Sequence, residues 1–188
     1  MSVTDASDEA LVARIAAGER LAMEGLYARH STRMYRFLVR LVRDPSTAED
    51  LMSDVFFDVW RQAGRYEGRS TIATWMLSIA RFKALSHLRR RSPSSLEPEV
   101  AETIEDEADT PEIGLQKTGK AEAIRRCLAA LSPEHREVID LVYYHERGVE
   151  EVAEIVGVPA GTVKTRLFHA RKRLSERLAA MGIDRGWP

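Results

Sequence analysis

A Gly-Val-Pro turn at residues 157–159 constrains the fold of this chain more than any other feature. The residues before it place an apolar face on a short helix, through Val152, Ile155 and Val156. Gly157 suits the left-handed conformation that ends a helix. Pro159 suits the start of the next helix, where its missing N–H is not needed. The pattern therefore predicts two helices joined by a tight turn.

The second of these helices has one apolar face and one basic, polar face. Its apolar spacing of four, three and four residues is carried by Val163, Leu167, Ala170 and Leu174. The outer face carries Thr162, Lys164, Thr165, Arg166, Phe168, His169, Arg171 and Lys172. In a helix-turn-helix, such a second helix reaches base edges while its cations hold phosphates. We therefore predict a DNA-reading helix-turn-helix over Glu150–Leu174, with an ordinary helical hairpin as the alternative.

Composition suits a soluble globular protein of one ordinary domain or two small ones. The chain has 188 residues, of which 44% are hydrophobic and 30% charged. Residues 2–9 are polar, unlike a signal peptide, and no apolar stretch approaches the roughly 20 residues that span a bilayer. The single cysteine, Cys127, has no partner for an internal disulfide, which suits a reducing compartment. We expect a cytoplasmic protein without membrane insertion, in which Cys127 is a small buried hydrophobe.

Charge is segregated along the chain although the net charge is only −1. Basic residues gather at 81–91 and 164–177, whereas acidic residues gather at 97–112. Binding to phosphates depends on local basic patches rather than on the charge of the whole chain. The near-neutral balance therefore does not exclude nucleic acid as a partner.

Helical periodicity runs through residues 8–91 and returns over residues 119–181. Between them, residues 92–118 are polar, acidic and interrupted by prolines, which is typical of a linker. No segment shows a convincing alternating strand pattern. We predict an all-α protein of two small helical domains joined by a flexible acidic linker, the C-terminal domain being the helix-turn-helix, with bounds 1–95, 96–117 and 118–188.

An acidic helix is predicted in the N-terminal half. Asp44-Pro45 reads as a turn, and Ser46-Thr47-Ala48-Glu49 has the form of a capping box that starts a helix over 48–62. Its core stripe is Leu51, Val55 and Val59, and a neighbouring face carries Asp50, Asp54 and Asp58. Carboxylates at this spacing repel one another. The stripe is either a solvated face or a docking surface for a basic partner.

A polar, glycine-containing loop at 64–70 precedes a predicted helix over 71–91. Trp75 and Ile79, with Phe82 as a third candidate, are predicted to face the core. Five cations lie within its last eleven residues: Arg81, Lys83, Arg89, Arg90 and Arg91. Cations near a helix C-terminus complement the helix dipole. Five exceed what that role requires, which favours contact with nucleic acid.

Two more helices are predicted before the helix-turn-helix. Ala121, Ile124, Leu128 and Leu131 form the core stripe of the first. The second begins at Ser132-Pro133, with Ser132 as N-cap and Pro133 at the first helical position. Val138, Ile139 and Val142 are predicted to point inward.

Several motifs follow one another in a fixed order: Ala48-Glu49-Asp50-Leu51, Asp54-Val55-Phe56, Val59-Trp60, Thr74-Trp75, Ile79-Ala80-Arg81, Leu88-Arg89-Arg90-Arg91, Leu131-Ser132-Pro133-Glu134-His135-Arg136, Val152-Ala153-Glu154, Gly157-Val158-Pro159 and Gly161-Thr162-Val163-Lys164-Thr165-Arg166. Each motif is moderately specific, and their order is a strong signal. Over nearly its whole length, the chain resembles an RNA polymerase sigma factor of the extracytoplasmic-function type.

The resemblance implies partners for each part of the chain. Residues 1–95 would be sigma region 2 and 118–188 sigma region 4, with the linker threading toward the RNA exit path. The helix 48–60 would dock on the clamp helices of the polymerase β′ subunit through Asp50, Leu51, Asp54, Val55, Asp58 and Trp60. The β flap and a dedicated anti-sigma factor are further implied partners, and no catalytic residue, metal or cofactor is implied.

The resemblance also implies two promoter contacts. The loop 66–71 and the helix after it would engage the −10 element and capture a flipped base, through Tyr66, Arg69, Ser70, Thr71, Trp75, Arg81, Phe82, Lys83, Arg89 and Arg90. The outer face of the second helix of the helix-turn-helix, named above, would read the −35 element. Phe82 and Ser86 stand where many relatives have Asn and Asp, and His169 where relatives often have Arg. Base preference at those places is therefore not implied.

Three other functions compete with this interpretation. A sigma mimic that sequesters an anti-sigma factor would not need Lys164, Arg166, Arg171 or the cations at 89–91. A conventional helix-turn-helix regulator leaves the aspartate stripe and the basic 81–91 helix unexplained. An enzyme is disfavoured because His30, His87, His135, His145 and His169 are scattered, and neither HExxH nor a Gly-rich phosphate loop is present.

Overall fold

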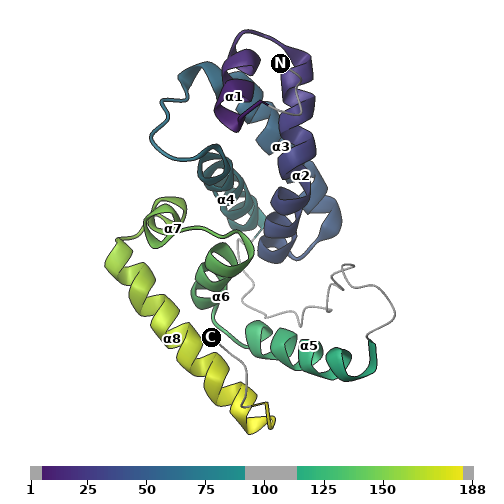
Figure 1. Ribbon diagram of the computed structural model, residues 1–188, viewed down its shortest axis with the longest axis vertical. Coiled ribbons are helices and arrows are strands. Elements are labelled where there is room, and N and C mark those ends of the chain that lie inside the picture. Colours follow the sequence, from purple (N-terminus) through teal and green to yellow (C-terminus); the bar gives the residue numbers. More distant parts are fainter. Residues whose placement is uncertain (1–5, 92–113, 184–188) are drawn as a thin grey trace. The chain divides into compact units, whose positions relative to one another are not determined.

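The computed structural model describes residues 6–91 and 114–183, with side chains from Ala121 onward in the second range. Every regular element in these ranges is a helix, which confirms the all-α prediction (Figure 1). The chain divides into two compact units, one built mainly from α1–α4 and the other mainly from α5–α8.

Five helical elements form the N-terminal unit: α1 (Asp8–Ala16), α2 (Arg20–Val42), α3 (Pro45–Gln62), the 3₁₀ turn η1 (Ala63–Arg65) and α4 (Ile72–Arg91). The long helix α2 packs against α1, α3 and α4 (Figure 1). Their shared core consists of fully buried apolar side chains, among them Leu11, Ile15, Leu26, Phe37, Leu38, Val55, Val59, Ile72 and Met76. This core fixes α3 and α4 on α2, so their outward faces are held by a common scaffold.

The helix α3 begins three residues earlier than predicted, and its cap is Asp44 rather than a Ser46–Glu49 capping box. The Asp44 carboxylate accepts the backbone N–H of Thr47 at 3.2 Å and also binds the Thr47 hydroxyl. Pro45 fits the first helical position, where no N–H is needed. These hydrogen bonds lower the pKa of the Asp44 carboxyl because they stabilise its charged form.

The core face of α4 differs from the predicted one. Phe82 does not face the core: its side chain is 69% exposed. Trp75 and Ile79 are half-buried. Fully buried positions are instead occupied by Ile72, Thr74, Met76, Ala80 and Ala84. Two alanines and a threonine thus share the buried face of α4 with the larger apolar side chains Ile72, Met76 and Leu77.

The C-terminal unit contains α5 (Gly114–Ala129), α6 (Pro133–Ile139), the π-helical segment η3 (Asp140–Tyr144), α7 (Val149–Val156) and α8 (Ala160–Ala180). The long helix α8 packs against α5 and α6. The core of this unit includes Cys127, as predicted, together with Leu131, Val138, Leu141, Val163, Leu167, Ala170 and Leu174. Because α5 begins at Gly114, the last residues of the predicted linker are helical; residues 92–113 lie outside the described ranges.

The segment around α6 follows the prediction only in part. Pro133 occupies the first helical position, as predicted. Ser132 makes no side-chain cap bond to the backbone, and its hydroxyl pairs with Nδ1 of His135 at 2.7 Å. The π turn was not predicted: the N–H of His145 donates to the carbonyl of Asp140, five residues back, at 3.2 Å. This turn shifts the helical register, so Leu141 is fully buried and Val142 only half-buried.

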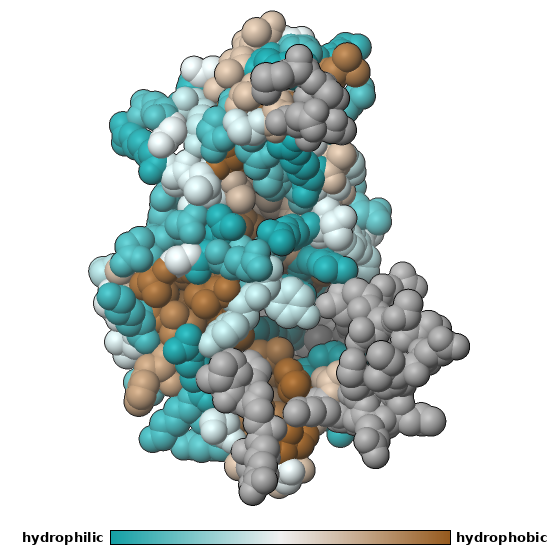
Figure 2. Space-filling model, in the orientation of Figure 1, coloured by the Kyte–Doolittle hydropathy of each residue, from teal (hydrophilic) through white to brown (hydrophobic). Residues whose placement is uncertain are grey.

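The visible surface is mostly hydrophilic, and apolar side chains reach it mainly among the helices of the C-terminal unit, low in the view (Figure 2). Within residues 6–91 and 114–183, no helix combines the length and apolar character needed to cross a membrane.

Candidate polymerase and nucleic-acid interfaces

The outward face of α3 carries only part of the predicted docking set. Asp50 and Asp54 are exposed, and Trp60 is half-buried. Leu51 and Val55 are only 7% and 0% exposed, because they belong to the core stripe that anchors α3. These two side chains therefore have little or no surface with which to contact a partner.

Asp58 pairs with Lys83 across the N-terminal unit. The Lys83 Nζ lies 2.8 Å from Oδ2 of Asp58, and both side chains are largely buried, with 19% and 27% of their surfaces exposed. The pair joins α3 to α4. It therefore satisfies two charges that the sequence assigned to two separate interfaces, polymerase docking for Asp58 and −10 DNA for Lys83.

We expect this pair to set the position of α4 relative to α3. In a double-mutant cycle with Asp58→Asn and Lys83→Gln, the coupling free energy between the two side chains should be about 1 kcal/mol. This is the upper end of the range measured for solvent-exposed ion pairs, and we expect it because the Asp58–Lys83 pair is partly shielded from water. The measurement is denaturant unfolding of the full chain, followed at the transition of the N-terminal unit. Additive effects of the two substitutions would show that the charges do not act as a pair.

Phe57 completes the exposed face of α3. This residue is 59% exposed, and the guanidinium carbon of Arg61 lies 5.6 Å from the centroid of its ring. Positions 50, 54, 57 and 61 recur at helical spacing, so these residues share one face. Sequence reasoning missed Phe57 because it follows Val55 and Phe56 in an apolar run. Its helical phase, which matches that of Asp50 and Asp54, was the available signal.

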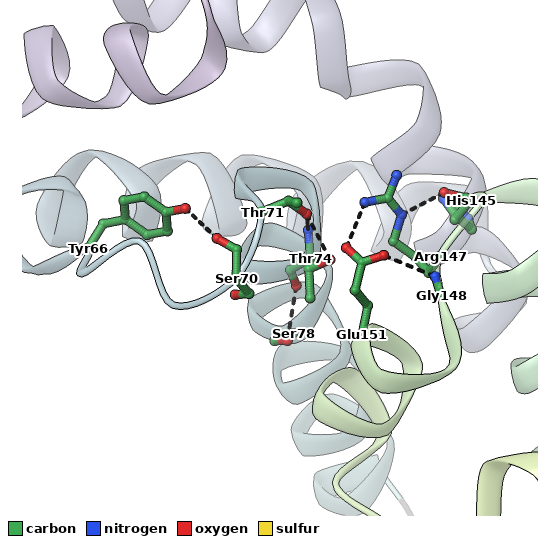
Figure 3. Close-up of polar contacts among 9 residues, drawn as sticks. All are labelled: Tyr66, Ser70, Thr71, Thr74, Ser78, His145, Arg147, Gly148 and Glu151. Atoms are coloured by element: carbon green, nitrogen blue, oxygen red, sulfur yellow. Dashed lines mark hydrogen bonds and ion pairs between the residues drawn. The ribbon is translucent and has the colours of Figure 1, made fainter. Parts of the chain in front are cut away.

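The loop between η1 and α4 is held in shape by hydrogen bonds (Figure 3). The Tyr66 hydroxyl donates to the carbonyl of Ser70, and the Tyr66 ring packs on Trp75 with centroids 5.1 Å apart. The Thr71 hydroxyl oxygen accepts the N–H of Thr74 at 3.3 Å, capping α4. Burial raises the pKa of the Tyr66 phenol, which favours the neutral form that donates. The loop thus presents a structured surface next to α4.

Cations and an aromatic ring lie exposed beside this loop and along α4. Arg69 is exposed and forms an ion pair with Glu67. Arg89 and Arg90 are exposed near the C-terminal end of α4, and Arg81 is half-buried. With the exposed ring of Phe82, they combine positive charge with an aromatic surface. Such combinations suit single-stranded nucleic acid, whose phosphates and unpaired bases need those two kinds of contact.

The first helix of the helix-turn-helix starts on a polar network (Figure 3). The N–H of Gly148 donates to Oε2 of Glu151 at 2.9 Å, and Nη1 of Arg147 lies 3.0 Å from Oε1 of the same carboxylate. Nε of Arg147 donates to the carbonyl of His145 at 2.7 Å. The Glu151 side chain thus reaches back over the first turn, as in a capping box, and fixes where α7 begins.

The turn between α7 and α8 has the predicted geometry. Gly157 has φ +70°, and the N–H of Val158 donates to the carbonyl of Ala153 at 3.2 Å. This six-to-one bond is typical of a helix end with glycine in the left-handed region. The start of α8 differs by one residue from the prediction. Pro159 is the N-cap of α8 rather than its first helical residue, and its carbonyl accepts the N–H groups of Thr162 and Val163.

The faces of α8 separate as predicted. Val163, Leu167, Ala170 and Leu174 are buried. Thr162 and Arg166 are half-buried, whereas the exposed residues are Lys164, Thr165, Phe168, His169, Arg171 and Lys172. The Thr165 hydroxyl donates to the carbonyl of Gly161 at 3.0 Å, which leaves its methyl group and oxygen lone pairs for a ligand. Burial lowers the pKa of the neighbouring His135, so this imidazole favours the neutral form.

Comparisons with known proteins match both units. The family model for sigma-70 region 2 matches residues 26–93, and the model for sigma-70 region 4 matches residues 121–174. The chain is 30% identical over 170 residues to RNA polymerase sigma factor CarQ of Myxococcus xanthus, covering 89% of this chain and 95% of that protein. It is 29% identical over 180 residues to the ECF sigma factor SigL of Mycobacterium tuberculosis, covering 94% and 99%.

A solved structure has a similar fold: the sigma factor RpoE of Bartonella quintana, crystallised with the anti-sigma factor NepR. The TM-score is 0.65 at 25% identity, over 83% of this chain and 96% of that one. Two matched sigma regions in the observed order, with relatives aligned over nearly their full length, identify the family. The chain belongs to the extracytoplasmic-function (ECF) sigma factors, the subunits that direct RNA polymerase to promoters.

Proposed function

We propose that this chain binds core RNA polymerase through α3 and recognises a promoter at two places, the −10 element through α4 and the −35 element through α8. One observation carries the proposal: a single chain presents an acidic face with an exposed aromatic residue and two separate basic surfaces. A sigma mimic or a simple regulator has no use for all three.

The polymerase-binding surface consists of Asp50, Asp54, Phe57 and Arg61, with Trp60 at its edge. Asp50 and Asp54 provide charge for a basic partner, and Phe57 provides an apolar anchor of the kind that dominates protein interfaces. Leu51 and Val55 support this surface from the core. Asp58 holds α3 on α4 through Lys83.

The −10 surface combines the ordered loop with the outer side of α4. Its proposed members are Tyr66, Arg69, Ser70, Thr71, Trp75, Arg81, Phe82, Arg89 and Arg90. The cations would hold the strand's phosphates, while the aromatic rings would stack on unpaired bases. Because Phe82 has no hydrogen-bonding group, it would contribute stacking rather than base-edge recognition.

The −35 surface is the outer face of α8, with Thr162, Lys164, Thr165, Arg166, Phe168, His169, Arg171 and Lys172. Exposed Lys164 near the helix N-terminus lies where recognition helices reach base edges, and it can donate to guanine acceptors. Arg171 and Lys172, two turns further along, would hold phosphates. The regions would span residues 1–95 and 118–188, the second also contacting the polymerase β flap.

We also propose control by an anti-sigma factor, supported by the similarity to RpoE, which was crystallised with NepR. With polymerase and promoter DNA as partners, the protein would act in the cytoplasm. It would carry out no catalysis itself, because sigma factors are transcription initiation factors that act by binding polymerase and DNA.

The test is transcription in vitro with purified core RNA polymerase and sheared genomic DNA from the source organism. The chain should co-elute with core in size-exclusion chromatography and start transcripts that core alone does not make. A chain that binds DNA but neither joins core nor starts transcripts would be a regulator of another kind.

A further inference from the structure

A residue outside the helix-turn-helix lies against one of the cations on the outer face of α8. Tyr143 lies in the π segment η3 and is 38% exposed. The guanidinium carbon of Arg171, on the outer face of α8, lies 5.5 Å from the centroid of that ring. This separation is within the range of a cation–π interaction, about 6 Å.

The π turn accounts for this placement. Leu141, two residues before Tyr143, is fully buried and anchors η3 in the core. The bond from the N–H of His145 to the carbonyl of Asp140 widens the turn. Such turns interrupt helical register and often occur at functional sites. Tyr143 therefore lies on a fixed backbone, with its ring against a cation of the neighbouring helix.

A tyrosine ring orders an arginine without neutralising it. Lys172, the next cation along α8, has the carboxylate of Glu176 at 4.0 Å, so part of its charge is already compensated. Arg171 instead rests on an uncharged ring and keeps its full charge for a phosphate. Holding a long side chain in place also reduces the conformational entropy lost on binding.

We infer that Tyr143 is a positioning residue that holds the Arg171 guanidinium ready for a DNA phosphate. The inference rests on the proposed −35 role of α8. Tyr143 is remote in sequence from the recognition helix α8, and it would contribute to DNA binding through Arg171.

The test uses holoenzyme, formed from the full chain and core polymerase, and a labelled duplex carrying a promoter recovered by run-off transcription. Tyr143→Leu should weaken binding about twofold to fivefold, the range of a partly exposed cation–π pair. Tyr143→Phe should bind like the wild type, because it keeps the ring face. In an Arg171→Ala background, Tyr143→Leu should have no further effect.

Each alternative outcome overturns the inference in its own way. Wild-type affinity for Tyr143→Leu would show that the ring does not matter. Equal weakening by Tyr143→Phe would show that the hydroxyl group, rather than the ring face, carries the effect. A full effect in the Arg171→Ala background would indicate a general packing defect. If wild-type holoenzyme selects no promoter at all, the proposed function fails, which is a separate and distinguishable result.

Discussion

Replacing Lys164 and Arg166 with alanine should weaken promoter binding by the holoenzyme at least about thirtyfold, taking a loss of about 1 kcal/mol or more for each specific contact. Lys164 is exposed and Arg166 half-buried on the polar side of α8, whose opposite side is fixed by Val163 and Leu167. The slope of log affinity against log salt concentration should also fall, by up to about two, because two cations no longer displace counterions.

The matched control for this variant is Arg125→Ala with Arg126→Ala. These two cations lie in the same unit, on α5, where both pair with Glu122. The control removes the same charge from a different surface and should leave both the affinity and the salt slope close to wild type. Equal weakening by both double variants would mean that net charge, rather than the face of α8, determines binding.

Phe57→Ala should weaken binding to core polymerase by roughly thirtyfold or more, the effect expected for an aromatic hot spot worth about 2 kcal/mol. Phe57 is 59% exposed in the free chain, so removal of its ring leaves no cavity in the core. It lies on the same face as Asp50 and Asp54, where burial against a partner would desolvate it. Affinity for labelled core polymerase, measured by fluorescence anisotropy, reports the change directly.

Phe82→Ala is the matched control for Phe57→Ala. The same side chain is removed from an exposed position of the same unit, on α4 instead of α3. Core binding should be unchanged in this variant, whereas promoter melting should be impaired. If the Phe57 variant retained full core affinity, the α3 face would not be the main docking surface.

Local chemistry made much of the C-terminal unit predictable. Helix ends and the α7–α8 turn depend on the residues at the turn itself, and Gly157 adopts the conformation that its missing side chain allows. The burial of Val163, Leu167, Ala170 and Leu174 follows from their helical spacing. The turn residues and the apolar spacing are both patterns within a short stretch of sequence, so both could be recognised from the sequence alone.

Features that depend on tertiary packing were not predictable in this way. The Asp58–Lys83 pair joins residues on two helices, and nothing in either local sequence indicates the other. Phe57 and Phe82 are exposed although Phe56 and Met76 beside them in the sequence or on the same helix are buried, so residue type alone does not separate core from surface. Asp44 displaced the predicted capping box because its side chain could reach Thr47. The π turn that orients Tyr143 is defined by a backbone hydrogen bond, from the His145 N–H to the Asp140 carbonyl, and no side chain in the sequence marks it.

Transcription start sites that depend on the chain test most directly whether it recognises a promoter at two places. Run-off transcripts from sheared genomic DNA, made with core polymerase in the presence and absence of the chain, would be mapped to their start sites. Two surfaces held at once by one polymerase predict upstream sequences that share two conserved blocks at a constant separation. Start sites that share one block only, or transcripts that do not depend on the chain, would contradict the account of a two-site promoter reader.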